Sequence, residues 1–547
     1  MPLQSRPPSL LPLPALAIAA TAFAVVAPFL FWGNPSGHDF EFHVFSWMEV
    51  LAQWKQGILY PRWASLAHWA YGEARFLFYP PASWTLGAVI GSVFPWKVVP
   101  GIYIWIALSA SGCSMFLLAR RWLSPRDATF AATLYAANPY YIVIVYWRSA
   151  LAELLAGALL PLLLLFVLRV EQEDRRMVIP LALVVAAAWL TNAPSAVMIN
   201  YSLALLIVAM AILKKSPRIL AIGGIAVALG AALAACYILP AAYEVRWVNI
   251  AQVLAPGVRP QDNFLFTTVS DPDHNRFNLL VSILATAEIV VLAAVCWLSR
   301  KWQASLKEGW WLLVLWAAAA VLLMLPVTFI FWQYLPKLRF VQLPWRWLLC
   351  LNVAFALLVS MGLRRWFSRV AVCAAMLLVI AGIWHQVQSP WWDNASDIEE
   401  MREAVHTGEG YEGTDEYVPV GADPYELNKT VPLVAARGGS AANIRVQTWK
   451  AQTKSFSTNM KEPGTLVLHL FDYPAWRVEV NGQVVQPQSD EVTGQMMIPV
   501  ASGDNEVKIT FVRTWDRKLG DAISIGTAAL VLGFVGFSKR RKALRPS

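Results

Sequence analysis

The chain has 547 residues, of which 57% are hydrophobic and only 14% are charged, and its formal net charge is +9. This composition excludes a soluble globular protein, because such proteins have about 25% charged residues. The basic excess is not typical of a nucleic-acid-binding protein, since most Lys and Arg stand in short clusters between apolar runs. The sequence therefore predicts a polytopic α-helical membrane protein that lies in a lipid bilayer and has no nucleic-acid partner.

Apolar runs that approach the length needed to cross a bilayer, about 20 residues, recur along the chain. We expect about twelve transmembrane helices, at 13–32, 98–119, 127–146, 150–168, 177–193, 195–213, 219–239, 277–298, 310–330, 346–363, 370–387 and 519–538. With the N-terminus in the cytoplasm, nearly every short basic cluster between these runs falls on the inner side, as the positive-inside rule requires. The basic tail at 539–542 then places the C-terminus in the cytoplasm as well.

The apolar segment 81–96 is shorter than the others and is bounded by prolines at both ends. Counting it as a transmembrane helix would place Arg120, Arg121 and Arg126 on the outer side, against the positive-inside rule. We therefore expect 81–96 to be a re-entrant or interfacial segment.

The residues from 388 to 518 have the composition of an extramembrane domain. Apolar and polar residues alternate there, as in half-buried strands, at 465–471, 476–480, 495–500 and 505–512. Asn481-Gly482 lies between two such runs and predicts a tight hairpin turn. We expect three parts: a transmembrane domain at 1–387 with a catalytic first outer loop at 33–96, a mainly β outer domain of sandwich type at 388–518, and a final transmembrane helix with a basic tail at 519–547.

Two carboxylates and two histidines lie within six positions directly beyond the first predicted helix: His38, Asp39, Glu41 and His43. Carboxylates next to a bilayer are costly to keep and usually functional. Asp39 and His43 are four positions apart, so on a helix they would share one face. The alternative is a solvated loop in which Asp39 caps an interfacial helix.

Arg62 and Tyr79 stand in aromatic stretches of the first outer loop, at 57–63 and 78–81. Aromatic rings beside a single Arg could hold a sugar ring and a phosphate. An amphipathic interfacial segment with a snorkelling Arg would have the same composition.

A second group of outer charges surrounds Arg148 and Glu153, which could form a site or a structural ion pair. Lys337, Arg339 and Arg346 gather near one outer boundary and depart from the positive-inside trend, and a site for an anionic headgroup or a phosphodiester would explain them. Further candidate substrate contacts are Gln342, Glu244 and Glu416, for which the alternative is an ordinary loop position.

Several chemistries have no motif in this sequence. There is no Walker loop or dinucleotide fingerprint, which argues against a nucleotide-driven step, and no Cys/His spacing of a zinc site. All five cysteines fall within predicted helices, which argues against a disulfide framework. We expect no required cofactor, although the carboxylates and histidines at 38–43 leave a divalent metal possible.

The order of these features resembles the GT-C glycosyltransferases, membrane enzymes that use lipid-phosphate-linked sugars. More closely, several stretches resemble a bacterial family of membrane proteins labelled as related to 6-pyruvoyl-tetrahydropterin synthase. These stretches are 39–43, 57–63, 78–81, 148–153, 342–346, 473–476 and 481–482. They extend over nearly the whole chain.

The resemblance implies a glycosyltransferase that takes a sugar from a polyprenyl-phosphate donor and transfers it to a glycan, lipid or protein. Asp39 would accept the proton of the attacking hydroxyl, with Glu41 as the alternative base, and a single displacement would invert the anomeric carbon. Arg346, together with Arg62 or Arg148, would hold the donor phosphate, and His43 would orient Asp39 or contact the phosphate. The protein would lie in the bacterial inner membrane, with its active site on the periplasmic face.

Two other functions remain open at the level of the sequence. A transporter or flippase of lipid-linked saccharides would need a polar path across the membrane, whereas the polar residues here gather at one face. A non-catalytic assembly protein would use the β domain to bind partners.

Overall fold

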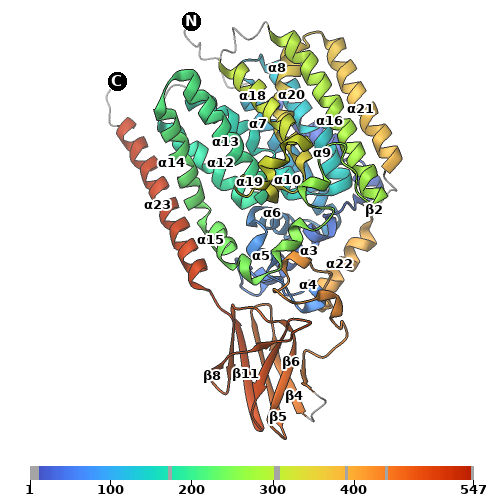
Figure 1. The fold of residues 1–547 in the computed structure, drawn as a ribbon, viewed down its shortest axis with the longest axis vertical. Coiled ribbons are helices and arrows are strands. Elements are labelled where there is room, and N and C mark those ends of the chain that lie inside the picture. The colour runs from blue at the N-terminus through green and yellow to red at the C-terminus, as the bar shows by residue number, and fades with distance from the viewer. Residues whose placement is uncertain (1–11, 171–174, 301–307, 388–391, 438–441, 544–547) are drawn as a thin grey trace. The chain divides into compact units, whose positions relative to one another are not determined.

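The computed structural model describes residues 12–170, 175–300, 308–387, 392–437 and 442–543 (Figure 1). These residues form two compact units, which we describe separately. Unit 1 contains Met1–His43, Phe94–Leu233 and Leu254–Ala395, and unit 2 contains Val44–Val93, Ala234–Val253 and Ser396–Ser547. This division differs from the domain boundaries predicted above, because parts of the first outer loop and a segment after residue 233 join the C-terminal residues.

Unit 1 is a bundle of apolar helices. Its longer members are α1 (Pro12–Val26), α7 (Val99–Ala119), α8 (Pro125–Ala136), α11 (Leu159–Val170), α12 (Val178–Thr191), α13 (Ala193–Lys214), α14 (Pro217–Leu233), α16 (Pro272–Ser299), α18 (Glu308–Leu323), α20 (Leu348–Gly362) and α21 (Trp366–Val387). Every residue of α20 from Leu348 to Met361 is buried, and α20 packs against α8, α16 and α18. Helix α20 is therefore the central helix of this bundle.

The predicted transmembrane segments correspond to helices. Among the described residues, eight helices are long and apolar enough to cross a membrane, two further pairs are bent within the apolar stretch, and two shorter apolar helices lie at Val178–Thr191 and Trp366–Gly382. Each of these overlaps one of the predicted ranges, so the polytopic helical architecture is confirmed. The exact number of crossings remains a prediction.

The polar break at Asn192 separates α12 from α13. Its side chain accepts a hydrogen bond from the backbone N–H of Ser195 at 2.9 Å, and Pro194 stands in the first turn of α13. An Asn cap followed by a proline is a common helix start, because the first backbone N–H groups of a helix have no partner within it. Asn192 is thus accounted for as a helix cap.

Unit 2 holds the short helix α6 (Pro81–Gly91), which covers the segment predicted to be re-entrant or interfacial. Its 11 residues extend about 16 Å at the ordinary helical rise. The hydrocarbon core of a bilayer is about 30 Å thick. Helix α6 alone is therefore too short to span a membrane.

The β-rich region of unit 2 consists of two antiparallel sheets. Their strand orders are β3-β6-β10-β9 and β4-β5-β11-β7-β8. The bounds are β3 (Val434–Ala436), β4 (Ala442–Trp449), β5 (Thr453–Met460), β6 (Gly464–Phe471), β7 (Trp476–Val480), β8 (Gln483–Val485), β9 (Gln488–Ser489), β10 (Gln495–Val500) and β11 (Gly503–Phe511). The four predicted strands are present as β6, β7, β10 and β11, and the other five strands of the two sheets are additional.

The predicted hairpin at Asn481-Gly482 is also confirmed. Val480 pairs with Gln483, and Asn481 and Gly482 have φ angles of 50° and 78°. Two consecutive left-handed residues are the requirement of a type I′ turn, which Asn-Gly meets at low steric cost.

The core of the sandwich includes residues from the first outer loop. Trp63, Tyr71 and Leu77 lie in the same buried cluster as strand residues Leu468 and Ile509. Residues 388–518 were expected to form a separate, mainly β domain, but their buried core also contains Trp63, Tyr71 and Leu77. Helix α22 (Ala395–Thr407) was not predicted.

Trp63 is fully buried, and its ring centroid lies 5.4 Å from Tyr473, 5.7 Å from Trp476 and 5.6 Å from Phe511. We expect Trp63→Ala to lower the free energy of unfolding of unit 2 by about 3–5 kcal/mol, because it removes buried apolar area and leaves a cavity. Thermal unfolding of the detergent-solubilised protein would measure this effect. The exposed Trp297 provides the control, since Trp297→Ala should change the unfolding temperature little.

Candidate functional site

Asp39 is held against the segment that carries Arg148. The backbone N–H of Asp39 donates to the carbonyl oxygen of Arg148 at 2.9 Å, and that of His38 donates to Trp147 at 3.3 Å. The backbone N–H of Gly37 donates to the hydroxyl of Ser149 at 3.1 Å. Helix α3 (Phe40–Lys55) begins directly after Asp39. Residues about 110 positions apart are therefore brought together at the N-terminus of α3.

The Asp39 carboxylate remains 36% exposed and forms a 2.9 Å ion pair with Nδ1 of His38. Burial opposes its ionisation, but the His38 hydrogen bond and the charges of His38 and Arg148 outweigh this effect and lower the pKa of Asp39 to about 2. Asp39 is therefore an anion at neutral pH, with an oxygen that solvent or a substrate can reach.

His43 is buried, and its Nε2 accepts a hydrogen bond from the backbone N–H of Leu151 at 3.2 Å. An imidazole nitrogen that accepts a hydrogen bond carries no proton, so this contact places the ring proton on Nδ1. His43 connects α3 with the start of α10 (Leu151–Ala156).

Arg148, Glu153 and Arg346 form one buried ion cluster. Glu153 Oε2 accepts from Nη1 of Arg148 at 2.8 Å and from Nε of Arg346 at 2.9 Å, and Oε1 accepts from the hydroxyl of Tyr140 at 2.6 Å. Glu153 is 1% exposed. A carboxylate at such a position stays charged only with strong partners, and here it has two guanidinium groups.

The local backbone geometry orients the side chains of Arg148 and Arg346. Arg148 ends a single π-helical turn, η2 (Ile144–Arg148), and the next residue, Ser149, is left-handed with φ of 50°. Such π-turns are rare and occur often at functional sites. The Arg148 guanidinium also lies 4.8 Å from the ring centroid of Trp345, which belongs to η10 (Pro344–Trp347) with Arg346.

Gln342 completes the surroundings of Arg346. Nη1 of Arg346 donates to the carbonyl oxygen of Val341 at 2.6 Å and to Oε1 of Gln342 at 3.0 Å. A guanidinium group has five N–H donors, and Nη2 of both Arg148 and Arg346 has no hydrogen-bond partner among the described residues. Two guanidinium groups and one carboxylate leave an excess of one positive charge. The cluster can therefore bind an anion.

Unit 1 thus brings together six of the predicted site residues: Asp39, His43, Arg148, Glu153, Gln342 and Arg346. Glu41 also belongs to unit 1, where it is exposed in the first turn of α3. The other four, Arg62, Tyr79, Glu244 and Glu416, belong to unit 2.

Arg62 and Glu244 have structural partners within unit 2. The Arg62 guanidinium lies 3.9 Å from the ring centroid of Tyr60, donates to the carbonyl oxygen of Cys236, and stands 3.6 Å from Asp521. Glu244, in α15 (Ala235–Glu244), accepts from Arg517 of α23 (Trp515–Ala543) and from the hydroxyl of Tyr473. Figure 1 shows α15 and α23 side by side. These contacts hold α15 and α23 together, and they give Arg62 and Glu244 a structural role.

Glu416 and Tyr79 are half-buried. Glu416 lies in η11 (Asp415–Tyr417), where burial raises its pKa to about 7. The neighbouring Tyr417 stacks on Phe78 with a centroid distance of 5.8 Å. The backbone carbonyl of Tyr79 accepts from the indole of Trp84 at 3.3 Å.

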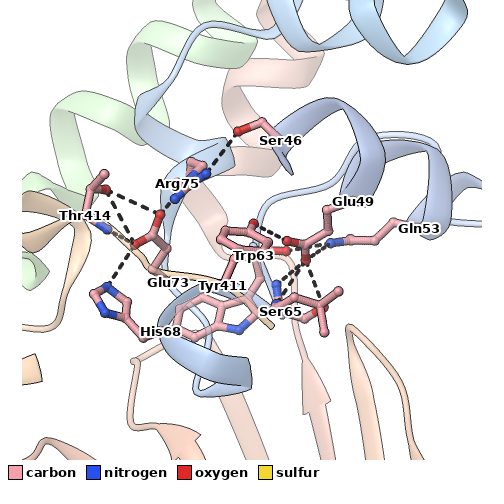
Figure 2. Close-up of polar contacts among 11 residues, drawn as sticks. Ser46, Glu49, Gln53, Trp63, Ser65, His68, Glu73, Arg75, Tyr411 and Thr414 are labelled. Carbon is pink, nitrogen blue, oxygen red and sulfur yellow. Dashed lines mark hydrogen bonds and ion pairs between the residues drawn. The ribbon is translucent and has the colours of Figure 1, made fainter. Parts of the chain in front are cut away.

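Sequence reasoning missed a buried polar network in unit 2, which Figure 2 shows. Glu49 accepts from the hydroxyl of Tyr411 at 2.5 Å, from Gln53 at 3.0 Å and from the hydroxyl of Ser65 at 2.9 Å. Burial raises the pKa of Glu49 even against these donors. The network ties α3 and the first outer loop to residue 411.

The second half of this network surrounds Glu73. Its carboxylate pairs with Arg75 at 2.5 Å and with His68 at 3.0 Å, and it accepts from the backbone N–H of Thr414 at 2.8 Å (Figure 2). Burial opposes ionisation of Glu73, but the charges of Arg75 and His68 and their hydrogen bonds lower its pKa to about 2. A single acid in an aromatic loop gives no sequence signal, since its partner Thr414 is 341 positions away.

Lys454 in β5 is a further buried charge. It is 3% exposed, donates to the carbonyl oxygens of Lys450 at 2.9 Å and Ala451 at 3.3 Å, and lies 4.4 Å from the ring centroid of Trp476. Burial lowers the pKa of Lys454 to about 7, although the charge of Glu49 acts in the opposite direction.

We expect Lys454→Met to stabilise unit 2 at pH 7, by on the order of 2 kcal/mol. The unfolded chain binds this proton below about pH 10.4, whereas the folded chain binds it only below about pH 7, so Lys454 makes the folded state gain stability as pH rises from 7 to 10. Unfolding temperatures of both proteins at pH 6, 7.5 and 9 would measure this. A difference in unfolding temperature between Lys454→Met and the wild type that does not decrease towards high pH would contradict this prediction.

The described residues contain no group of three or more His, Cys, Asp or Glu that could hold a metal ion. The carboxylates and histidines at 38–43 therefore do not form a metal-ligand cluster. His38 and Asp39 pair with one another, and the Nε2 of His43 is directed to Leu151.

The family described as "6-pyruvoyl-tetrahydropterin synthase related domain; membrane protein" matches residues 76–389. The match covers more than half of the chain. The chain belongs to this family. The predicted family and the membrane location are thereby confirmed. No curated protein matches the chain.

Several solved structures of membrane glycosyltransferases are similar to the chain. ArnT from Cupriavidus metallidurans bound to undecaprenyl phosphate has 12% identity and a TM-score of 0.40, over 72% of this chain and 75% of that chain. The oligosaccharyltransferase of Archaeoglobus fulgidus in the apo form has 14% identity and a TM-score of 0.37, over 73% and 56%. Arabinofuranosyltransferase AftD from Mycobacteria has 18% identity and a TM-score of 0.39, over 68% and 27%. The activities in these names belong to those proteins.

Proposed function

We propose that the protein is an integral membrane glycosyltransferase that transfers a sugar from a polyprenyl-phosphate donor to an acceptor hydroxyl. The observation that carries this proposal is the arrangement in unit 1 of an accessible anion, Asp39, beside the cluster of Arg148, Glu153 and Arg346. Glycosyl transfer from a phosphate needs these two elements, a base for the attacking hydroxyl and cations for the leaving phosphate.

The proposed reaction is a single displacement. The acceptor oxygen attacks the anomeric carbon and forms the new glycosidic bond, while the bond from that carbon to the phosphate oxygen breaks and its electron pair stays on the phosphate. Asp39 takes the proton of the acceptor hydroxyl. One displacement inverts the anomeric carbon and requires no covalent sugar–enzyme intermediate.

The charge of the arginine cluster matches the charge that the phosphate gains as the bond breaks. The donor is a phosphodiester with one negative charge, and the excess positive charge of the cluster is also one. As the bond breaks, the phosphate gains a second negative charge, so its attraction to Arg148 and Arg346 increases in the transition state. Their uncommitted Nη2 donors suit contacts to phosphate oxygens.

The remaining predicted residues take supporting roles in this proposal. His43 fixes the start of α3 against α10 and so positions Asp39. Glu41, exposed in the first turn of α3, is the alternative base. Tyr79 and Glu416 stay predicted substrate contacts, and the acceptor is a glycan, a lipid or a protein. We place the protein in the bacterial inner membrane with cytoplasmic termini and a periplasmic active site.

A transfer assay on purified protein in nanodiscs tests this function. Radiolabelled polyprenyl-phosphate monosaccharides would be offered one at a time, with membrane extract as the source of acceptor. Labelled product with the wild type but not with Asp39→Asn is the expected result and identifies the donor. Release from none of the donors, together with movement of intact lipid across vesicles, would replace this function with lipid-linked saccharide transport.

A further inference from the structure

The segment that follows α18 exposes four large apolar side chains. The chain turns by 90° at the end of α18 and continues as η8 (Pro326–Thr328) and α19 (Phe329–Tyr334). Val327 and Tyr334 are 79% and 78% exposed, and Ile330 and Phe331 are also exposed. Apolar side chains exposed next to a membrane-spanning helix are typical of a segment that lies in the bilayer interface.

Two cations follow this apolar segment directly. Lys337 and Arg339 are both exposed, and the ring of Phe340 lies near both, with centroid distances of 5.1 Å to Nζ of Lys337 and 5.2 Å to Cζ of Arg339. Neither cation has a carboxylate partner among the described residues. Arg148, by contrast, is paired with Glu153.

The loop that presents these cations is well anchored. Leu338 and Val341 are buried, and the hydroxyl of Tyr201 donates to the carbonyl oxygen of Pro336 at 2.9 Å. Lys337 and Gln342, at the two ends of η9 (Leu338–Val341), have positive φ angles of 62° and 65°. Such angles cost non-glycine residues free energy and persist where the surroundings fix the loop.

We propose that Lys337 and Arg339 bind the phosphate of an anionic phospholipid of the surrounding bilayer. The apolar side chains at 327–334 place the loop at the membrane interface, and the anions abundant there are lipid phosphates. Both cations lie beside the same ring, that of Phe340, so their charges add in one place on the surface. This site is distinct from the arginine cluster, because Lys337 and Arg339 are exposed whereas Arg346 is buried and bonded to Glu153.

The site also has a direct connection to the cluster. Val341 and Gln342 follow Arg339 in the chain. The backbone carbonyl of Val341 and the side-chain amide oxygen of Gln342 accept hydrogen bonds from Nη1 of Arg346. A phospholipid bound at Lys337 and Arg339 would hold this loop in the conformation that orients Arg346. The lipid composition of the membrane would then influence the cluster.

The test measures bound lipid and needs no turnover. Its result therefore does not depend on whether sugar transfer is detected. The protein would be purified from mixed phosphatidylglycerol and phosphatidylcholine nanodiscs, and retained lipids would be counted by native mass spectrometry. We expect the wild type to retain phosphatidylglycerol preferentially. In Lys337→Gln/Arg339→Gln this preference should fall by about fivefold for each cation removed.

Two further variants separate a lost site from a damaged protein. Lys337→Arg/Arg339→Lys keeps both charges and should retain the preference, whereas Arg445→Gln/Lys508→Gln removes two exposed cations of the β sandwich and should not change it. An unchanged preference in Lys337→Gln/Arg339→Gln would overturn the proposal. So would retention of added polyprenyl phosphate, but not phosphatidylglycerol, at these two cations.

Discussion

Asp39→Asn is expected to lower kcat/KM for sugar transfer by about 10²- to 10⁴-fold, the usual contribution of a general base. The amide has the shape of the carboxylate and can still accept the hydrogen bond from His38, but it cannot take a proton from an acceptor hydroxyl. Because the side chain is 36% exposed, the change in stability should be small. Initial rates with a saturating acceptor, beside unfolding temperatures, would measure both effects.

Glu41→Gln is the matched control, since it removes the neighbouring carboxylate and should retain most of the activity. A normal rate in Asp39→Asn with loss in Glu41→Gln would move the base to Glu41. The pH dependence gives a second check. The lowered pKa of about 2 keeps Asp39 ionised from pH 5 to 8, so its ionisation should not limit kcat/KM there. Its contribution to stability is present above pH 4 and is lost as pH falls towards 2.

Arg346→Ala is expected to lower kcat/KM by about 10²- to 10³-fold, the usual effect of removing one donor that stabilises developing charge. Arg346→Lys should recover only part of this loss. A lysine keeps the charge but cannot bond Glu153, Val341 and Gln342 from one planar group while it contacts a phosphate. Binding of polyprenyl phosphate and steady-state transfer, measured on both variants, would separate binding from catalysis.

Arg369 offers the matched control for Arg346. It forms a 2.7 Å ion pair with Asp127 elsewhere in unit 1, so Arg369→Ala should change stability without reducing transfer. Glu153 remains paired with Arg148 and Tyr140 when Arg346 is removed, and the protein should therefore stay folded. Equal transfer rates in Arg346→Ala and the wild type would exclude Arg346 from the phosphate site.

The helices and half of the sandwich were predictable because they rest on local patterns. Apolar runs located the helices, and alternation located β6, β7, β10 and β11. β4 was missed because it alternates only from Ala442 to Val446, before its register shifts between Val446 and Thr448. β5 was missed because part of its interior is polar. It buries Lys454 and Thr458. A buried polar residue breaks the pattern from which a strand is predicted.

The candidate site was predictable in its residues but not in its partners. Arg148 and Glu153 are five positions apart and could be paired by eye, whereas Arg346 is 193 positions from Glu153. The same limit applied to Arg62 and Glu244, whose partners Asp521 and Arg517 lie in the last helix. Glu49 and Glu73 have close partners in sequence, but their network also needs Tyr411 and Thr414, which are 362 and 341 positions away and could not be predicted.

The shared core of the first outer loop and the β sandwich has a consequence for synthesis of the protein. The carbonyl oxygen of Trp69 contacts His469, 400 positions later, and His68, Trp69 and Ala70 hold left-handed backbone angles. Ribosomes add about 5–20 residues each second, so on the order of half a minute passes between the synthesis of Trp69 and that of His469. A chain that terminates early would contain most of its apolar helices and yet leave this loop without its partners and open to proteases. Full-length translation is therefore a condition for the folding of unit 2.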